Sequence, residues 1–210
     1  NTAVGAFSLD ANTTGAGNVA IGKSALTTAT TASNNIAIGL EACNLLTTGA
    51  ENTVVGTYAA DQLETGSENT AIGRAALGAA TTSSYNTGVG CYTLLVNTTG
   101  ASNTALGSGA GQAVTTGSNN TLLGRKAGHI MTTQASCTYV GTQSGTYTEG
   151  SNNTAVGYYA LRGSNGSTTG THNTAVGYQA GDAVTSASEC TFLGRDAGGG
   201  VTTGSYNTAI

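Results

Sequence analysis

The sequence has little charge, no proline and no tryptophan. Only 8% of its 210 residues are charged, whereas a typical soluble protein carries about 25%. This low charge argues against generic disorder, which is associated with high net charge and with proline. The formal net charge of −4 removes the electrostatic basis for holding a phosphate backbone, so nucleic acid is not expected as a partner.

Long apolar runs are also missing. No stretch approaches the roughly 18 apolar residues that a membrane span needs. The chain does not open with a basic segment followed by an apolar one, as a signal peptide would. We therefore expect no membrane insertion in this segment.

What the sequence does contain is a repeat, the block Asn-Thr-Ala-Ile/Val-Gly, from end to end. The intervals between its glycines are 17 residues eight times, then 16, 20 and 17. A thirteenth copy begins at Asn207 and reaches Ile210. The repeat glycines are Gly5, Gly22, Gly39, Gly56, Gly73, Gly90, Gly107, Gly124, Gly141, Gly157, Gly177 and Gly194.

The repeat predicts an all-β fold, a parallel β-solenoid with about 17 residues per coil. Glycine costs about 1 kcal/mol per helix position relative to alanine, and the high glycine content therefore disfavours helices. The Thr-x-Ile/Val segment has the period of two and the β-branched residues of a short strand. The repeat glycine then marks a bend, a second short strand follows, and a Thr-Thr-Gly loop leads to the next copy.

Stacking of these coils gives one domain over residues 1–210, with thirteen coils of which the last is truncated. At a strand spacing of about 4.8 Å, the rod is roughly 60 Å long. We place the 16- and 20-residue intervals around Gly150 and Ser164-Asn165-Gly166 as changes of loop length that leave the coil intact. Because the chain begins and ends inside a repeat, we interpret it as a segment of a longer fibre.

Side-chain size predicts which face of the strand points inward. We expect the threonines and the Ile/Val residues inside, because only they have the volume to fill a coil. Asn and Ala, as in Asn69 and Ala71, are then expected outside, with the asparagines hydrogen-bonded from coil to coil. The alanines would form a flat apolar strip along the rod, which suits close approach of a second or third copy of the chain.

The repeat carries a family resemblance. Asn-Thr-Ala-Val-Gly with a following Gly-x-x-Ala resembles the repeat of YadA-like trimeric adhesin heads. The segment from Asn173 to Gly181, Asn-Thr-Ala-Val-Gly-Tyr-Gln-Ala-Gly, is also similar to repeats of phage and algal-virus tail-fibre proteins. The resemblance covers the whole chain. It implies a left-handed β-roll, three chains around one axis, and a fibre or adhesin exposed on a cell surface or virion.

Residues that could carry chemistry are few. Four cysteines lack the spacing of a metal site: Cys43, Cys91, Cys137 and Cys190. We expect all four to be buried free thiols, with pairing between chains near a symmetry axis as the alternative. His129 and His172 are isolated and are interpreted as solvated loop residues. The ten acidic residues are scattered and show no carboxylate pair of the kind that cuts polysaccharide. We predict no enzyme, no catalytic residue, no metal and no cofactor.

Five tyrosines follow the repeat glycine by one or two positions, on the expected second strand. They either pack at the surface or between chains, or they stack on sugars as exposed aromatic side chains. These possible glycan contacts are Tyr58, Tyr92, Tyr158, Tyr159 and Tyr178.

Together these observations favour a structural or adhesive fibre segment, extracellular or on a virion, that assembles as a homotrimer and can contact a cell-surface glycan or receptor. One alternative is an ice-binding solenoid, since threonine ladders and flat faces are typical of such surfaces. Against it, the threonines share a face with Ile/Val residues that we expect to point inward. A second alternative is a glycan-binding or glycan-degrading fibre.

Overall fold

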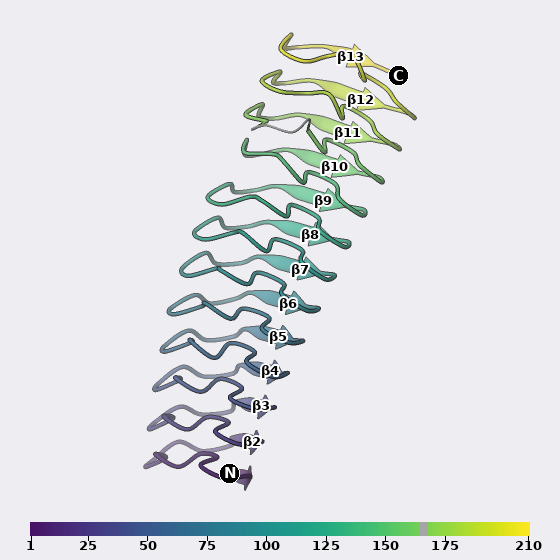
Figure 1. Cartoon of the computed structure of the whole chain (residues 1–210). Coiled ribbons are helices and arrows are strands. Elements are labelled where there is room, and N and C mark those ends of the chain that lie inside the picture. The colour runs from purple at the N-terminus through teal and green to yellow at the C-terminus, as the bar shows by residue number, and fades with distance from the viewer. Residues whose placement is uncertain (164–167) are drawn as a thin grey trace.

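The computed structural model describes residues 1–163 and 168–210 and shows a parallel β-solenoid of about 12 turns with about 17 residues per coil (Figure 1). Each coil contributes one short strand to a single 13-stranded sheet whose order follows the sequence. Among the described residues there is no helix. The strands are β1 (Thr2–Val4), β2 (Val19–Ile21), β3 (Ile36–Ile38), β4 (Thr53–Val55), β5 (Thr70–Ile72), β6 (Thr87–Val89), β7 (Thr104–Leu106), β8 (Thr121–Leu123), β9 (Thr138–Val140), β10 (Thr154–Val156), β11 (Thr174–Val176), β12 (Thr191–Leu193) and β13 (Thr208–Ala209).

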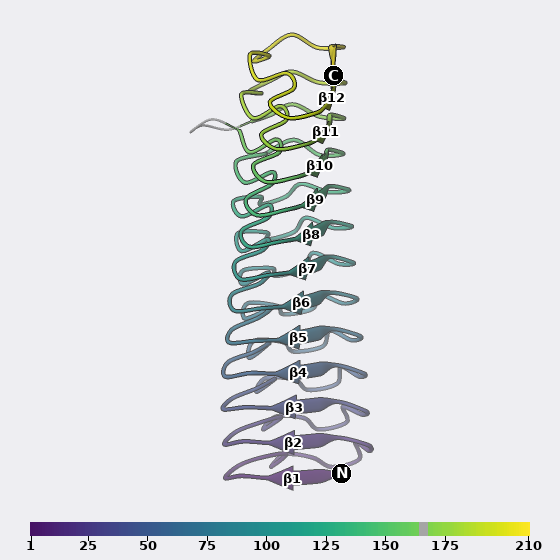
Figure 2. The ribbon, with the colours of Figure 1, turned by 90° about the vertical axis from the view of Figure 1, so that its right-hand side faces the viewer.

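Every strand pairs in register with the next, so equivalent residues of successive coils lie directly above one another (Figure 2). Thr70 pairs with Thr87, for example. The shorter interval keeps this register, since Thr138 pairs with Thr154. The longer one keeps it too, since Thr154 pairs with Thr174. Both unequal intervals therefore leave the stack intact, as predicted, although Ser164-Asn165-Gly166 itself lies outside the described residues.

The repeat glycine makes the predicted bend at the end of each strand. Its φ angle lies between 126° and 144° in all twelve coils, a region that L-residues rarely adopt. The backbones also approach closely here: a Cβ added at Gly73 would lie 2.6 Å from the carbonyl oxygen of Gly90 in the next coil. Glycine is therefore required for two separate reasons, its conformation and its missing side chain.

The prediction of a second strand after the bend is wrong. The residues there form turns in which the second and fourth positions after the glycine have positive φ, such as Ser24 (58°) and Leu26 (51°). Main-chain hydrogen bonds between coils hold these turns; Ser24 N–H donates to Ala6 and Leu26 N–H donates to Ala42. The recurrence of glycine at the fourth position, as in Gly111, was the sequence signal for this conformation.

The face assignment of the strand is also wrong. The middle residue of each strand from β2 to β12 is buried, whereas the threonine and the Val/Ile/Leu on either side of it are partly or fully exposed. The predicted alanine strip, including Ala71, therefore lies in the core, not on the surface. Size within one strand misled the prediction, because the interior is narrow and is filled jointly by the strand and by the turn facing it.

The asparagine ladder exists as predicted, but inside the coil. Asn86 is fully buried, and its side-chain oxygen accepts hydrogen bonds from both the main-chain N–H (3.0 Å) and the side-chain amide (3.1 Å) of Asn103. Its own amide donates to Asn69 (3.3 Å) and to the Gly100 carbonyl (2.9 Å). The donors and the acceptor of a buried amide need hydrogen-bond partners, and inside the coil the neighbouring asparagines and main-chain carbonyl groups supply them.

Replacing Asn86 with alanine is expected to lower the free energy of unfolding by roughly 3 kcal/mol, because each buried group left without a partner costs about 1–3 kcal/mol. The measurement is the midpoint of denaturant unfolding. The control is Asn44→Ala, a partly buried asparagine outside the ladder, for which a change within about 0.5 kcal/mol is expected. Equal effects of the two substitutions would contradict a stabilising ladder.

The core shows a compensation of volumes between strand and turn. Leucine occupies the fourth position after the bend in five of the twelve coils, and in four of these the middle residue of the strand is alanine. Where the strand carries Leu122, Tyr139 or Phe192, the fourth position is glycine instead, both in the turn that precedes the strand and in the turn that follows it. Gly88 shows the converse: the middle residue of the strand is glycine, and the turns before and after it carry Leu77 and Leu94.

Candidate interaction surfaces

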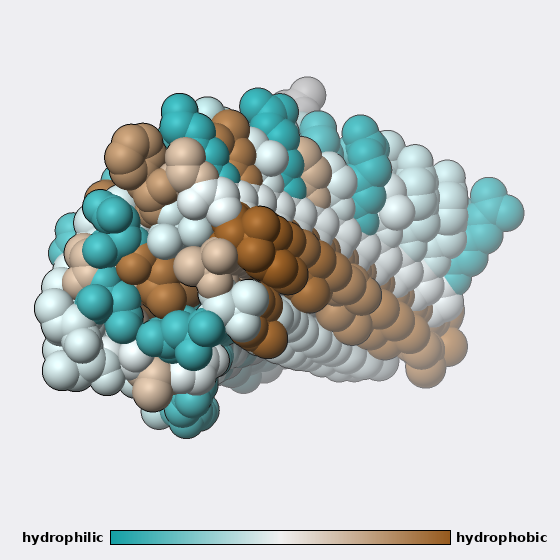
Figure 3. Space-filling model, turned by 90° about the horizontal axis from the view of Figure 1, so that it is seen from below, coloured by the Kyte–Doolittle hydropathy of each residue, from teal (hydrophilic) through white to brown (hydrophobic). Residues whose placement is uncertain are grey.

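The exposed face of the sheet consists of two parallel columns of side chains. One is the column at the start of each strand, called here the threonine column because its residue is threonine in every strand except β2 (Val19) and β3 (Ile36). The other, the aliphatic column, is the residue just before each repeat glycine, and Figure 3 shows it as a continuous brown stripe along the rod. Its members are Val4, Ile21, Ile38, Val55, Ile72, Val89, Leu106, Leu123, Val140, Val156, Val176, Leu193 and Ile210.

The aliphatic column is large for an exposed apolar surface. Ile72 is 38% exposed and Leu106 is 50% exposed, although both belong to the middle of the sheet. A strip about 60 Å long and about 10 Å wide covers roughly 600 Å², whereas free monomers rarely expose more than a few hundred Å² in one patch. No charged residue interrupts the column or the threonine column beside it.

A second candidate surface lies at the bends, where the structure brings three of the five predicted tyrosines together. Tyr158 (42% exposed) and Tyr159 follow one bend, and Tyr178 (45% exposed) follows the next. Tyr58 and Tyr92 follow earlier bends of the same edge, so they belong to the same surface but not to this cluster. All five lie on turns, not on the second strand that the sequence predicted.

The clustered rings are ordered. Those of Tyr158 and Tyr178 are stacked, with centroids 5.5 Å apart and an interplanar angle of 11°. Tyr159 lies beside Tyr158 at 3.9 Å. The neighbouring Tyr159 side chain raises the pKa of Tyr158 above its usual value. The three rings thus form a compact cluster across two coils, in which Tyr158 and Tyr178 are exposed and Tyr159 is partly buried.

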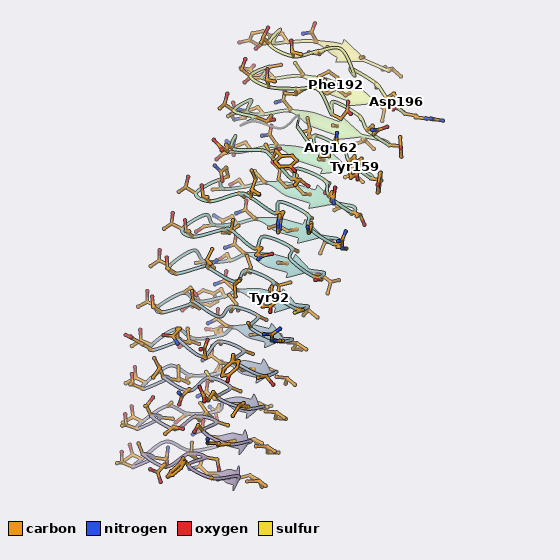
Figure 4. The ribbon with its side chains drawn as sticks, viewed as in Figure 1. Tyr92, Tyr159, Arg162, Phe192 and Asp196 are labelled. Atoms are coloured by element: carbon orange, nitrogen blue, oxygen red, sulfur yellow. The ribbon has the colours of Figure 1, made fainter. Side chains whose placement is uncertain are left out.

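Arginines stack on these tyrosines, a feature that the sequence analysis missed. The guanidinium of Arg162 lies 4.4 Å from the ring centroid of Tyr159, and that of Arg195 lies 5.5 Å from Tyr178. Figure 4 labels Tyr159 and Arg162, together with Asp196, the neighbour that forms an ion pair with Arg195 at 3.1 Å.

A third such pair lies lower on the rod, where Arg74 stacks at 5.1 Å on Tyr92 of the next coil. The signal for it was present in the sequence: an arginine one position after a bend precedes, by one coil, a tyrosine two positions after the next bend. The same spacing does not produce the other two pairs, so pattern alone would have found only this one.

The described residues also enclose a shallow hollow of about 200 Å³ between the turns of three successive coils. Leu95, Val96 and Ile130 line it with His129, whose Nδ1 lies 3.1 Å from the Gly109 carbonyl oxygen. This volume is below the roughly 300 Å³ at which small-molecule pockets begin. His129 is partly buried, and so differs from the solvated residue predicted, whereas His172 is exposed as predicted.

All four cysteines are free. Cys43, Cys137 and Cys190 are buried as predicted, but Cys91 is only partly buried, which corrects the prediction for that residue. Desolvation, with a smaller contribution from Asp61, raises the pKa of the Cys43 thiol to about 12, and burial also raises that of Cys137. These thiols are therefore protonated and unreactive at neutral pH.

Among residues 1–163 and 168–210, no group of three or more His, Cys, Asp or Glu side chains is placed to hold a metal ion. The same residues contain no helix of the length and apolarity needed to cross a membrane. No protein-family model, curated protein or solved structure matches the chain.

Proposed function

We propose that this chain is a structural and adhesive fibre segment on a cell surface or virion, which assembles with copies of itself through the exposed face of its sheet. The observation that carries the proposal is the aliphatic column. It replaces the alanine strip as the self-association surface, because the alanines are buried. The repeat's resemblance to trimeric adhesins and tail fibres favours three parallel chains around one axis.

The physical argument for self-association rests on area and on repetition. Each buried Å² of apolar surface contributes about 25 cal/mol, so covering a strip of roughly 600 Å² contributes about 15 kcal/mol, against an association cost of about 4–15 kcal/mol. Parallel rods with the same rise per coil present their columns at the same intervals. A copy of this chain therefore complements the surface along its whole length, which an unrelated globular partner does not.

The assembly is tested by mass in solution, where we expect three times the 20.4 kDa of one chain. Placing lysines in the column, as Ile38→Lys with Val156→Lys, is expected to yield monomers, because ammonium groups cannot be buried without a partner. Both side chains are 36% exposed, so each lysine is accommodated in the free chain.

The matched control adds two lysines outside the column, as Val96→Lys with Tyr85→Lys; these residues are 36% and 59% exposed. This variant is expected to keep the mass of the unmodified protein. A wild-type chain that stays monomeric at all concentrations tested, or a control that dissociates as readily as the column variant, would overturn the proposed assembly.

The outward direction of the threonine column favours ice binding as a second candidate function. The objection raised from the sequence no longer holds, because the threonine and aliphatic columns both point outward from a regular sheet. A monomer that produces thermal hysteresis would support this function over fibre assembly. In the proposed trimer the aliphatic column is covered, and no hysteresis is expected.

A further inference from the structure

Charge is segregated around the coil. We define the bend edge as the two residues that follow each repeat glycine. Two acidic residues, Glu41 and Asp196, lie on it, so its net charge is +3, whereas the rest of the chain holds one cation and eight acids and has a net charge of −7. Five of the six Lys and Arg residues lie on this edge: Lys23, Arg74, Arg125, Lys126 and Arg195. An acidic protein thus carries one basic edge along its length.

The sixth cation joins the same surface through space. Arg162 comes from further along its turn, yet its guanidinium stacks on Tyr159 of the bend edge. Three of the four arginines are therefore held against tyrosine rings, of which Tyr178 is exposed and Tyr92 and Tyr159 are partly buried. The side chain of Arg195 remains 79% exposed despite its ion pair with Asp196, and such exposed pairs contribute little energy, so its N–H donors stay accessible.

Each Arg–Tyr pair combines two recognition elements. The guanidinium presents a planar fork of N–H donors that matches a carboxylate in bidentate geometry. The tyrosine ring holds the guanidinium in place by stacking and adds a phenol hydroxyl, which suits the hydroxyl groups of a sugar. An acidic sugar offers both partners on one ring.

We infer that the bend edge binds an acidic polysaccharide, a chain that contains uronic or sialic acids, with the stacked Tyr158–Tyr178 pair and its flanking arginines as the main contact. This deepens the adhesive part of the proposed function, on which it rests. The edge repeats at about 4.8 Å per coil, so an extended glycan that runs along the rod meets equivalent positions repeatedly.

The spacing of the cations distinguishes this ligand from nucleic acid. Lys23, Arg74 and Arg125 are separated by three coils each, or about 14 Å along the axis. Double-stranded DNA carries one negative charge per 1.7 Å or so, which requires a far denser row of cations than this edge supplies. A glycan with one carboxylate every few sugars matches the lower density.

The test is retention of the whole chain on immobilised hyaluronan, with dextran as the neutral glycan and a DNA oligonucleotide as the non-glycan polyanion. We expect binding to hyaluronan, weakened by salt, and little to the other two. Arg74→Gln, Arg162→Gln and Arg195→Gln together are expected to weaken hyaluronan binding at least tenfold, and Tyr158→Asn with Tyr178→Asn similarly.

The matched control is Tyr85→Asn with Tyr206→Asn, which removes two exposed tyrosines outside the bend edge and should leave binding unchanged. No retention on hyaluronan, equal retention on DNA, or equal losses in the control would each overturn the inference. Mass in solution separates it from the proposed assembly. A trimer that retains no hyaluronan contradicts only the glycan site, whereas a monomer that retains it contradicts only the assembly.

Discussion

Gly73→Ala is expected to destabilise the protein by roughly 4 kcal/mol or more, an exceptional loss for removing no contact. The φ angle of 130° alone costs an alanine about 1–3 kcal/mol. The new methyl group would also lie 2.6 Å from the Gly90 carbonyl oxygen, which forces two adjacent coils apart. Because coils contact only their neighbours, this separation divides the stack into two blocks.

Thermal melting followed by circular dichroism should therefore show two transitions in this variant, and limited proteolysis should cut near residue 73. Gly200→Ala is the control, because an added Cβ there meets no atom within 4 Å and its φ is not positive. Its stability should change by no more than about 0.5 kcal/mol. If Gly73→Ala has the same melting temperature as the unmodified protein, the close approach of backbones at the bends does not determine stability.

Phe192→Ala is expected to cost about 3–5 kcal/mol, the usual range for removing a buried aromatic ring. Phe192 is fully buried, and the glycines on either side of it, Gly181 and Gly198, leave nothing that could fill the space. Phe7→Ala serves as the control, since Phe7 is 62% exposed. Denaturant unfolding of both variants measures the difference.

The compensation of volumes predicts a rescue. Leucine at Gly181 and Gly198 should recover at least half of the stability lost in Phe192→Ala, because it recreates the leucine-and-alanine layers found elsewhere. The backbone permits this: φ is 62° at Gly181 and already 51° at Leu26, the equivalent position of another coil. With Phe192 in place, Gly181→Leu should instead destabilise, because its Cβ would lie 2.6 Å from the ring. Independent, additive effects would contradict the compensation.

The sequence predicted the coil, its period, the strand position and the glycine bend, because translational repetition constrains all of these at once. It did not predict the face of the strand. Ile72 looked like a core residue and Ala71 like a surface residue when their volumes were compared within one strand. Which face of the strand points inward depends on Leu77, which fills the interior from the opposite wall of the coil.

The candidate surfaces were predictable to different degrees. The position of Tyr158 relative to its bend placed it on one edge with Tyr178, because the coil period aligns equivalent residues. The stacked arginines were not predictable as a set, since Arg162 reaches Tyr159 from elsewhere in its turn. The aliphatic column was visible as a pattern, but its exposure followed only from the inverted face.

The unequal filling of the layers has a consequence for how such a chain folds. Nearly identical repeats can pair out of order, and misassembly between units is a characteristic failure of repeat proteins. If the coil that carries Gly181 were skipped, the bulky ring of Phe192 would meet Leu161 where the correct neighbour offers a glycine. Steric mismatch at Phe192 therefore penalises intermediates in which this coil is skipped, before the rod is complete.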